Sequence, residues 1–163
     1  MIEAARTPRQ GEIELADLLA VERIETGCQM SSKKRLMEKI TSLLLQGGAQ
    51  LDRKTVLQTL IERERLGSTG IGNGVALPHG RISGLDDVIG AVVVLAHPLD
   101  YDAVDDAPVN LAFGLLVPAQ ANEQHLKILA HLARLFSDEA IRDEIITANN
   151  NLEVFDLLTT WTG

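Results

Sequence analysis

Apolar residues recur every three to four positions in two stretches of the first half of the chain, which predicts two amphipathic helices. The first helix begins at the serine pair 31–32 and ends at the glycine pair 47–48. The second begins at Asp52 and ends at Gly67, which we expect to be a left-handed C-cap. The buried faces are expected to consist of Leu36, Met37, Ile40, Leu43 and Leu44 in the first helix and Val56, Leu57, Leu60 and Ile61 in the second.

The helical period returns near the end of the chain and predicts three further helices, over residues 122–136, 137 to about 148, and about 151–160. Each begins at a side chain suited to capping a helix N-terminus, namely Asn122, Ser137 and Asn151. Residues 13–20 form a short amphipathic helix candidate. Residues 1–11 lack periodicity, which is typical of a mobile tail.

Between the helices the apolar residues run together instead of alternating. Residues 88–96 and 109–117 are nearly continuous apolar runs, as expected of strands buried on both faces. Residues 75–82 form a strand interrupted by Pro78, so this part is expected at a sheet edge or strand end. Residues 21–30 are a candidate edge strand. The pattern predicts one α/β domain over residues 12–163, in which helices cover a mixed sheet.

Composition narrows the partners that this domain can have. Aromatic residues make up 3 % of the 163 positions, so few side chains are available to stack on bases or sugars. The net charge of −8 disfavours general binding to nucleic acid or to an anionic membrane surface. We expect no membrane insertion and no export, since no apolar run approaches ~20 residues and the N-terminus lacks a signal-peptide core. The lone Cys28 cannot form an internal disulfide, which favours a cytoplasmic setting.

Residues 67–81, GSTGIGNGVALPHGR, have four glycines in their first eight positions, followed by a short apolar stretch and a histidine. Glycines let a backbone approach a ligand closely, and successive amides can attract an anion. A flexible turn is the alternative. The spacing matches neither the P-loop nor the dinucleotide fingerprint, so we expect neither ATP nor NAD. The candidate phosphate-binding residues of this loop are Gly67, Ser68, Thr69, Gly70, Gly72, Asn73 and Gly74.

His79 lies between Pro78 and Gly80, where little side-chain bulk covers it. A neutral imidazole is a competent nucleophile at pH 7, so His79 is a candidate phosphoryl acceptor, general base or metal ligand, with a structural role as the alternative. His125 falls in the first turn of a predicted helix, where the helix dipole suits a neutral donor to an anion. His97 is expected to have a surface or turn role, and His131 is expected to be a solvated residue.

Arg63 lies four residues before the glycine loop. Its guanidinium is a candidate anion donor, and it is otherwise a solvated helix arginine. Arg65 is an alternative donor that the spacing does not exclude.

Two long segments resemble the IIA domain of the fructose–mannitol class of the bacterial phosphoenolpyruvate:sugar phosphotransferase system, and within it the nitrogen-regulatory IIA branch. The first is RERLGSTGIGNGVALPHG, and the second is PLDYDAVDDAPVNLAFGLLVPAQANEQHLKILAHLA. The resemblance covers roughly residues 13 to 160. It departs in one turn, where the family usually has Asp-Gly and this chain has DDAP at residues 105–108.

The resemblance implies a compact α/β sandwich with a mixed sheet and helices on both faces. It assigns His79 as the phosphorylated histidine, His125 as the second active-site histidine and Arg63 as the active-site arginine. The implied donor is an HPr-type carrier (NPr) charged by enzyme I from phosphoenolpyruvate, and the implied targets are proteins such as kinases or transporters. No cofactor or metal is expected.

Three alternatives differ from a phosphocarrier with a regulatory output. One is a sugar-specific IIA component that passes phosphate to a IIB domain. Another is a pure binding module, in which phosphorylation of His79 acts only as a switch. The third, a metal-dependent hydrolase using His79 and His125, lacks nearby carboxylates at ligand spacing.

Overall fold

The computed structural model describes residues 14–47, 50–121 and 123–163. The predicted tail at residues 1–11 lies outside these ranges. Six strands form one mixed sheet in the order β1-β5-β6-β3-β2, with β4 also paired to β6. The strands are β1 (Ile24–Cys28), β2 (Gly70–Gly72), β3 (Val75–Ala76), β4 (His79–Ile82), β5 (Ile89–Leu99) and β6 (Val109–Pro118).

The two apolar runs pair as the antiparallel strands β5 and β6, and both are buried over most of their length. The predicted strand over residues 75–82 is divided, because Pro78 has no N–H to donate to a ladder. Both pieces, β3 and β4, pair in parallel with β6. The strand β1 lies at the sheet edge, as predicted.

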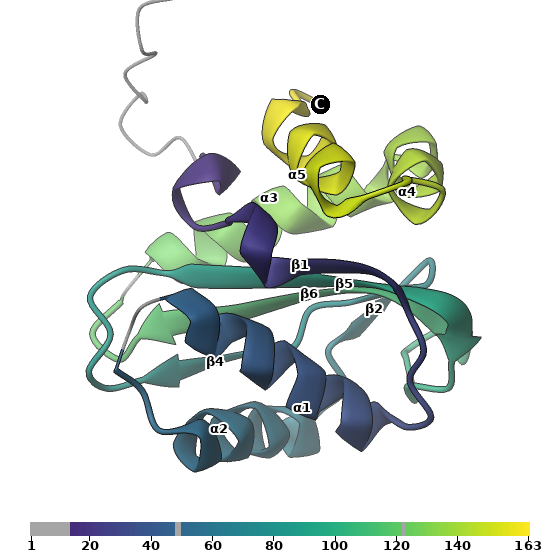
Figure 1. Cartoon of the computed structure of the whole chain (residues 1–163). Helices are drawn as coiled ribbons and strands as arrows, with labels where there is room; N and C mark the ends of the chain where they lie inside the picture. The colour runs from purple at the N-terminus through teal and green to yellow at the C-terminus, as the bar shows by residue number, and fades with distance from the viewer. Residues whose placement is uncertain (1–13, 48–49, 122) are drawn as a thin grey trace, which may run out of the picture.

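Helices cover both faces of the sheet, so the predicted fold class is confirmed (Figure 1). One face carries α1 (Lys33–Leu44) and α2 (Arg53–Leu66), and the other carries α3 (Gln124–Ser137), α4 (Glu139–Ile146) and α5 (Asn151–Thr160). Each face has its own buried apolar cluster. In the described ranges, no helix is both long enough and apolar enough to cross a membrane.

The local capping signals explain where the first two helices begin. The Ser32 side chain accepts a hydrogen bond from the Arg35 amide, and Asp52 accepts one from the Thr55 amide. The predicted left-handed cap at Gly67 is wrong, because its backbone is extended, with φ 159° and ψ 143°. The chain therefore leaves α2 directly into the glycine loop.

Further predictions differ from the structure. Residues 15–17 form a short 3-10 turn in place of the expected helix over residues 13–20. Residues 21–23 form a second 3-10 turn, so the strand expected over residues 21–30 is limited to β1. The cap of α4 is Asp138, whose carboxylate accepts from the Ala140 amide, and not Ser137. The cap of α5 is Asn150, which frees Asn151 to accept from the Thr26 amide of β1. Asn122 lies outside the described residues, and the position before α3 is Glu123.

The turn that departs from the family pattern closes with an acidic residue in a conformation that usually favours glycine. Asp106 has φ 57°, and its amide donates to the Ala103 carbonyl at 3.0 Å. Aspartate tolerates this left-handed region better than most side chains because its short polar group can bond locally. The turn is thus built without the usual glycine.

Candidate functional site

His79 is the first residue of β4 and is half-buried. Its Nδ1 lies 2.6 Å from the Leu77 carbonyl oxygen. Because a carbonyl can only accept, Nδ1 carries the proton and the lone pair of the neutral ring is on Nε2. Burial lowers the pKa of His79, and the charges of Arg63 and His125 lower it further, against the opposing effects of Leu77 and Glu64. His79 is therefore a neutral, oriented imidazole at pH 7.

This geometry predicts that His79 titrates below the ordinary histidine pKa of 6.5. As the pH falls, His79 is therefore protonated in the unfolded chain before it is protonated in the folded chain. The free energy of unfolding decreases accordingly as the pH falls from 6.5 toward the folded pKa. Ring ¹⁵N and ¹H NMR titration checks both the midpoint and the tautomer, with the urea-unfolded chain as the reference. A midpoint at or above 6.5, or a proton on Nε2 of the neutral ring, contradicts the assignment.

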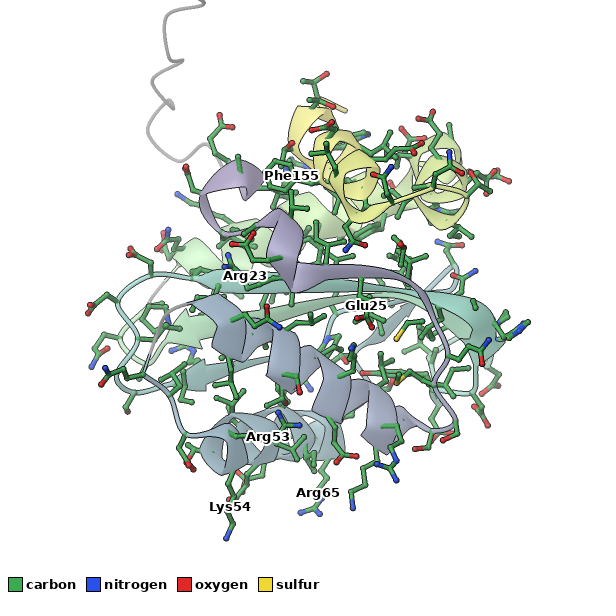
Figure 2. All side chains as sticks on the ribbon, viewed as in Figure 1. Arg23, Glu25, Arg53, Lys54, Arg65 and Phe155 are labelled. Carbon is green, nitrogen blue, oxygen red and sulfur yellow. The ribbon has the colours of Figure 1, made fainter. Side chains whose placement is uncertain are left out.

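The α2 helix brings Arg63 to the start of the glycine loop that leads to His79. A Cβ added to Gly80 would lie 2.6 Å from the Thr59 side chain, so α2 packs directly against β4. Arg63, one turn further along α2, donates from Nη1 to the Gly67 carbonyl at 2.9 Å. Figure 2 shows Arg65 extending from α2 away from the sheet. The structure therefore favours Arg63 over Arg65 as the residue that faces the glycine loop.

The glycine loop folds into a small hairpin formed by β2 and β3. Its turn places Gly72, Asn73 and Gly74 consecutively at positive φ, at 95°, 59° and 80°. Two glycines are therefore required by the backbone itself. Several of the predicted anion donors bind within the protein: the Gly70 amide donates to Ser68 Oγ at 3.1 Å, and the Asn73 amide donates to Asp105 at 3.2 Å.

A carboxylate that the sequence analysis missed holds the start of this loop. Glu64, with 8 % of its side chain exposed, accepts from the Thr69 amide at 3.0 and 2.9 Å and from the Thr69 hydroxyl at 2.7 Å. It also pairs with Lys33 Nζ at 2.9 Å. The Thr69 and Tyr101 hydroxyls share a hydrogen bond of 3.0 Å, and burial raises the pKa of Tyr101, so its hydroxyl stays protonated.

His125 lies in the first turn of α3 and is half-buried, as expected. Arg81, which the sequence analysis did not single out, donates from Nη2 to the His125 ring, at 3.2 Å from Nδ1 and 3.1 Å from Nε2. Arg81 lies two residues after His79 on the same face of β4 and contacts the His125 ring, so the two histidines lie on one side of the sheet. The structure thus places His79, Arg81 and His125 on one side of the sheet, and Arg63 at the glycine loop that precedes His79.

The other two histidines lie apart from this group. His97 is exposed in β5, in agreement with the predicted surface role. His131 is half-buried and packs edge-on against Trp161 at 5.6 Å, so the prediction of a simply solvated residue is wrong. Cys28 is buried, and burial raises the pKa of its thiol to about 11. Within residues 14–47, 50–121 and 123–163, no three His, Cys, Asp or Glu side chains are grouped to hold a metal ion.

Comparison with known proteins identifies the family to which the chain is related. The family described as "Phosphoenolpyruvate-dependent sugar phosphotransferase system, EIIA 2" matches residues 17–161. The chain is 42 % identical over 136 residues to a nitrogen regulatory protein of Pseudomonas aeruginosa, covering 83 % of this chain and 88 % of that relative. It is 34 % identical over 128 residues to a fructose-specific EIIA component of Haloferax volcanii, covering 78 % and 83 %.

A solved structure extends the agreement to the fold. The crystal structure of the nitrogen regulatory protein IIA-Ntr of Neisseria meningitidis superposes with a TM-score of 0.85 at 40 % identity, covering 89 % of this chain and 99 % of that one. The resemblance found in the two long segments is confirmed. The chain belongs to the EIIA type 2 family of the phosphoenolpyruvate-dependent sugar phosphotransferase system.

Proposed function

We propose that this chain is a phosphocarrier and regulatory protein of the nitrogen-related phosphotransferase system. It accepts a phosphoryl group on His79 from an HPr-type carrier (NPr), which enzyme I charges from phosphoenolpyruvate, and its phosphorylation state regulates partner proteins such as kinases or transporters. The orientation of His79 carries the proposal, since the Leu77 carbonyl holds the Nδ1 proton and leaves the Nε2 lone pair free. Relatives named nitrogen regulatory proteins support the regulatory output.

The transfer step needs no cofactor. The Nε2 lone pair of His79 attacks phosphorus, and the P–N bond to the donor histidine breaks. The electron pair of that bond returns to the donor ring, which leaves as neutral imidazole because its other nitrogen is already protonated. His79 then carries the phosphoryl group on Nε2 and keeps its proton on Nδ1. No proton has to move during the step, so the protein contributes alignment and charge stabilisation.

Charge on the phosphoryl oxygens is met by the groups that surround His79. Arg63 stands at the glycine loop through its bond to Gly67, and His125 presents its ring from the first turn of α3. A helix N-terminus and a guanidinium both favour an anion. Each donor is expected to contribute about 2–4 kcal/mol to the transition state, by analogy with oxyanion-hole donors.

Exposed apolar side chains next to this site support a protein as the phosphoryl donor. Leu66 ends α2, Ile71 is the middle residue of β2, and Leu126 follows His125. Val104 adjoins the glycine loop, because both of its neighbours in the chain contact that loop. Ala103 packs against Gly70, and Asp105 accepts a hydrogen bond from the Asn73 amide. Exposed apolar surface beside a site is typical of a protein–protein contact, and these residues are exposed on or next to the elements that carry the site. The apolar rim comprises Leu66, Ile71, Val104 and Leu126.

Replacing Leu126 with serine is expected to raise KM for the phosphorylated carrier about tenfold, with kcat within about twofold, because the change removes apolar contact area without touching the acceptor. The matched control is Leu152→Ser. Leu152 is 55 % exposed on α5 and Leu126 is 59 % exposed on α3, so both changes replace an exposed helical leucine. Steady-state transfer kinetics with purified carrier make the comparison. Equal KM values for the two variants contradict docking at the rim.

Reconstitution tests the function itself. The chain is mixed with enzyme I, phosphoenolpyruvate, and either a nitrogen-related or a sugar-related HPr-type carrier, and the labelled residue is mapped by mass spectrometry under phosphohistidine-preserving conditions. We expect label on His79, with faster labelling from the nitrogen-related carrier. Label on another residue, or none from either carrier, overturns the proposal.

The fructose-specific relative at 34 % identity favours a second candidate, a sugar-specific IIA component. The phosphorylated chain would then pass its group to a IIB domain. Adding purified fructose-type and mannitol-type IIB domains to the labelled chain separates the two functions. Rapid loss of label to a IIB domain supports sugar transport, and retention of label supports regulation.

A further inference from the structure

Arg81 shares a face of β4 with His79. Successive strand residues point to opposite sides, so positions 79 and 81 lie on one side and positions 80 and 82 on the other. Burial follows this alternation: Gly80 and Ile82 are buried, His79 is half-buried and Arg81 is exposed. Gly80 faces α2, and therefore His79 and Arg81 point toward the layer that contains α3.

The guanidinium of Arg81 is held by an unusual partner. Its Nη2 lies 3.1–3.2 Å from both ring nitrogens of His125. A guanidinium only donates, so the ring nitrogen that accepts must carry a lone pair, and His125 is neutral in this arrangement. A neutral imidazole offers a single acceptor, which is a poor match for the five N–H donors of a guanidinium.

We propose that Arg81 binds the phosphoryl group carried by His79 and exchanges its His125 partner for the phosphoryl oxygens when transfer occurs. The assignment rests on the proposed function of His79. The physical basis is that a phosphoryl group is a stronger hydrogen-bond acceptor for Arg81 than the His125 ring. A phosphoryl group presents three charged oxygens, so an arginine can form two parallel hydrogen bonds with it, whereas it forms one with a neutral imidazole. The strand spacing supports it, since residues two apart on one face are ~7 Å apart, within reach of an arginine side chain.

The exchange also changes His125. Once Arg81 turns to the phosphoryl oxygens, the ring nitrogen that accepted from it becomes free, and the N–H of His125 can donate to the same group. Arg81 thus keeps His125 oriented in the empty site and becomes a ligand in the phosphorylated one. A surface arginine without this role would leave the stability of the phosphohistidine unchanged.

The first measurement is the equilibrium of transfer between phosphorylated carrier and this chain, without enzyme I or phosphoenolpyruvate. We expect Arg81→Gln to shift the equilibrium about tenfold toward the carrier, because a charge-assisted bidentate contact is lost from the phosphorylated form alone. Arg81→Lys keeps the charge and should recover part of the loss. Arg65→Gln is the matched control, since it removes the same charge from a side chain that points away from the sheet (Figure 2), and should stay within twofold. Equal equilibrium constants of transfer for Arg81→Gln and Arg65→Gln overturn the proposal.

The second measurement does not use the carrier. Phosphoramidate is used to phosphorylate histidine directly, and the Arg81 Nε–Hε resonance is followed by NMR in wild type and in His79→Gln. We expect the resonance to shift and its exchange with water to slow in wild type alone. A resonance that does not move while His79 carries phosphate overturns the proposal. If the resonance moves but neither carrier labels the protein, the role of Arg81 is supported. Only the phosphoryl donor named in the proposed function is then overturned.

Discussion

The His79→Ala variant is expected to fold normally and to accept no phosphoryl group, with labelling at least a thousandfold below wild type. The acceptor nitrogen is absent, whereas Arg63, His125 and the glycine loop remain in place. The cost in stability should be small, about 1 kcal/mol, because the side chain is half-buried and its ring makes one hydrogen bond to the described residues, that to the Leu77 carbonyl. Transfer from phosphorylated carrier and a thermal unfolding scan measure the two effects separately.

The matched control is His97→Ala, because His97 is exposed in β5 and lies apart from the site. It should label at the wild-type rate. A His79→Ala protein that still takes label on a histidine would show that another ring is the acceptor. His125 would then be the first ring to test, since it contacts Arg81 on the same face of β4 as His79.

Much of the scaffold around this site could be predicted from the sequence, because the signals are local. The apolar runs at β5 and β6 reflect burial on both faces, and Ser32 and Asp52 cap helices through amides three residues away. Local signals failed where two neighbouring residues compete for one role. Asp138 caps α4 in place of Ser137, and Asn150 caps α5 in place of Asn151, whose side chain reaches β1 instead.

The proposed acceptor and its two proposed partners could be named because of a family resemblance over long segments. The supports of the site could not, since their partners are distant along the chain. Glu64 forms an ion pair with Lys33 of α1, and the Thr69 hydroxyl shares a hydrogen bond with that of Tyr101, 32 positions away. Arg81 resembles any exposed strand arginine until α3 places His125 beside it. These contacts depend on the tertiary packing, for which a local pattern carries no signal.

Glu64→Gln is expected to destabilise the chain by about 3 kcal/mol. The carboxylate is nearly buried, accepts both polar groups of Thr69 and pairs with Lys33. Glutamine keeps the shape but replaces one acceptor oxygen with a donor that faces other donors, and it removes the charge that Lys33 faces. For a domain of this size, the loss corresponds to a fall in Tm of roughly 6–12 °C. Denaturant and thermal unfolding measure it.

Glu62→Gln is the matched control for this change. It makes the same substitution on the same helix, but at an exposed position where the carboxylate accepts from Gln58 at 3.0 Å. We expect the free energy of unfolding to change by less than about 0.5 kcal/mol. If Glu64→Gln is as stable as Glu62→Gln, the carboxylate is not the anchor of the loop.

The anchor predicts an effect on the site as well as on stability, because Thr69 leads directly into the β2–β3 hairpin. In Glu64→Gln, the Thr69 amide should exchange with solvent faster, and the rate of phosphoryl acceptance by His79 should fall, while the residue that takes the label stays the same. Lys33→Met leaves the carboxylate its bonds to Thr69 but removes its counter-charge and the contact of Nζ with the Tyr101 ring at 4.3 Å. The double variant should lose less stability than the two single variants together, because both changes act on one network. If the losses in the free energy of unfolding of the two single variants add up to that of the double variant, Lys33 and Glu64 act independently. The loop would then be held by the hydrogen bonds of Thr69 alone.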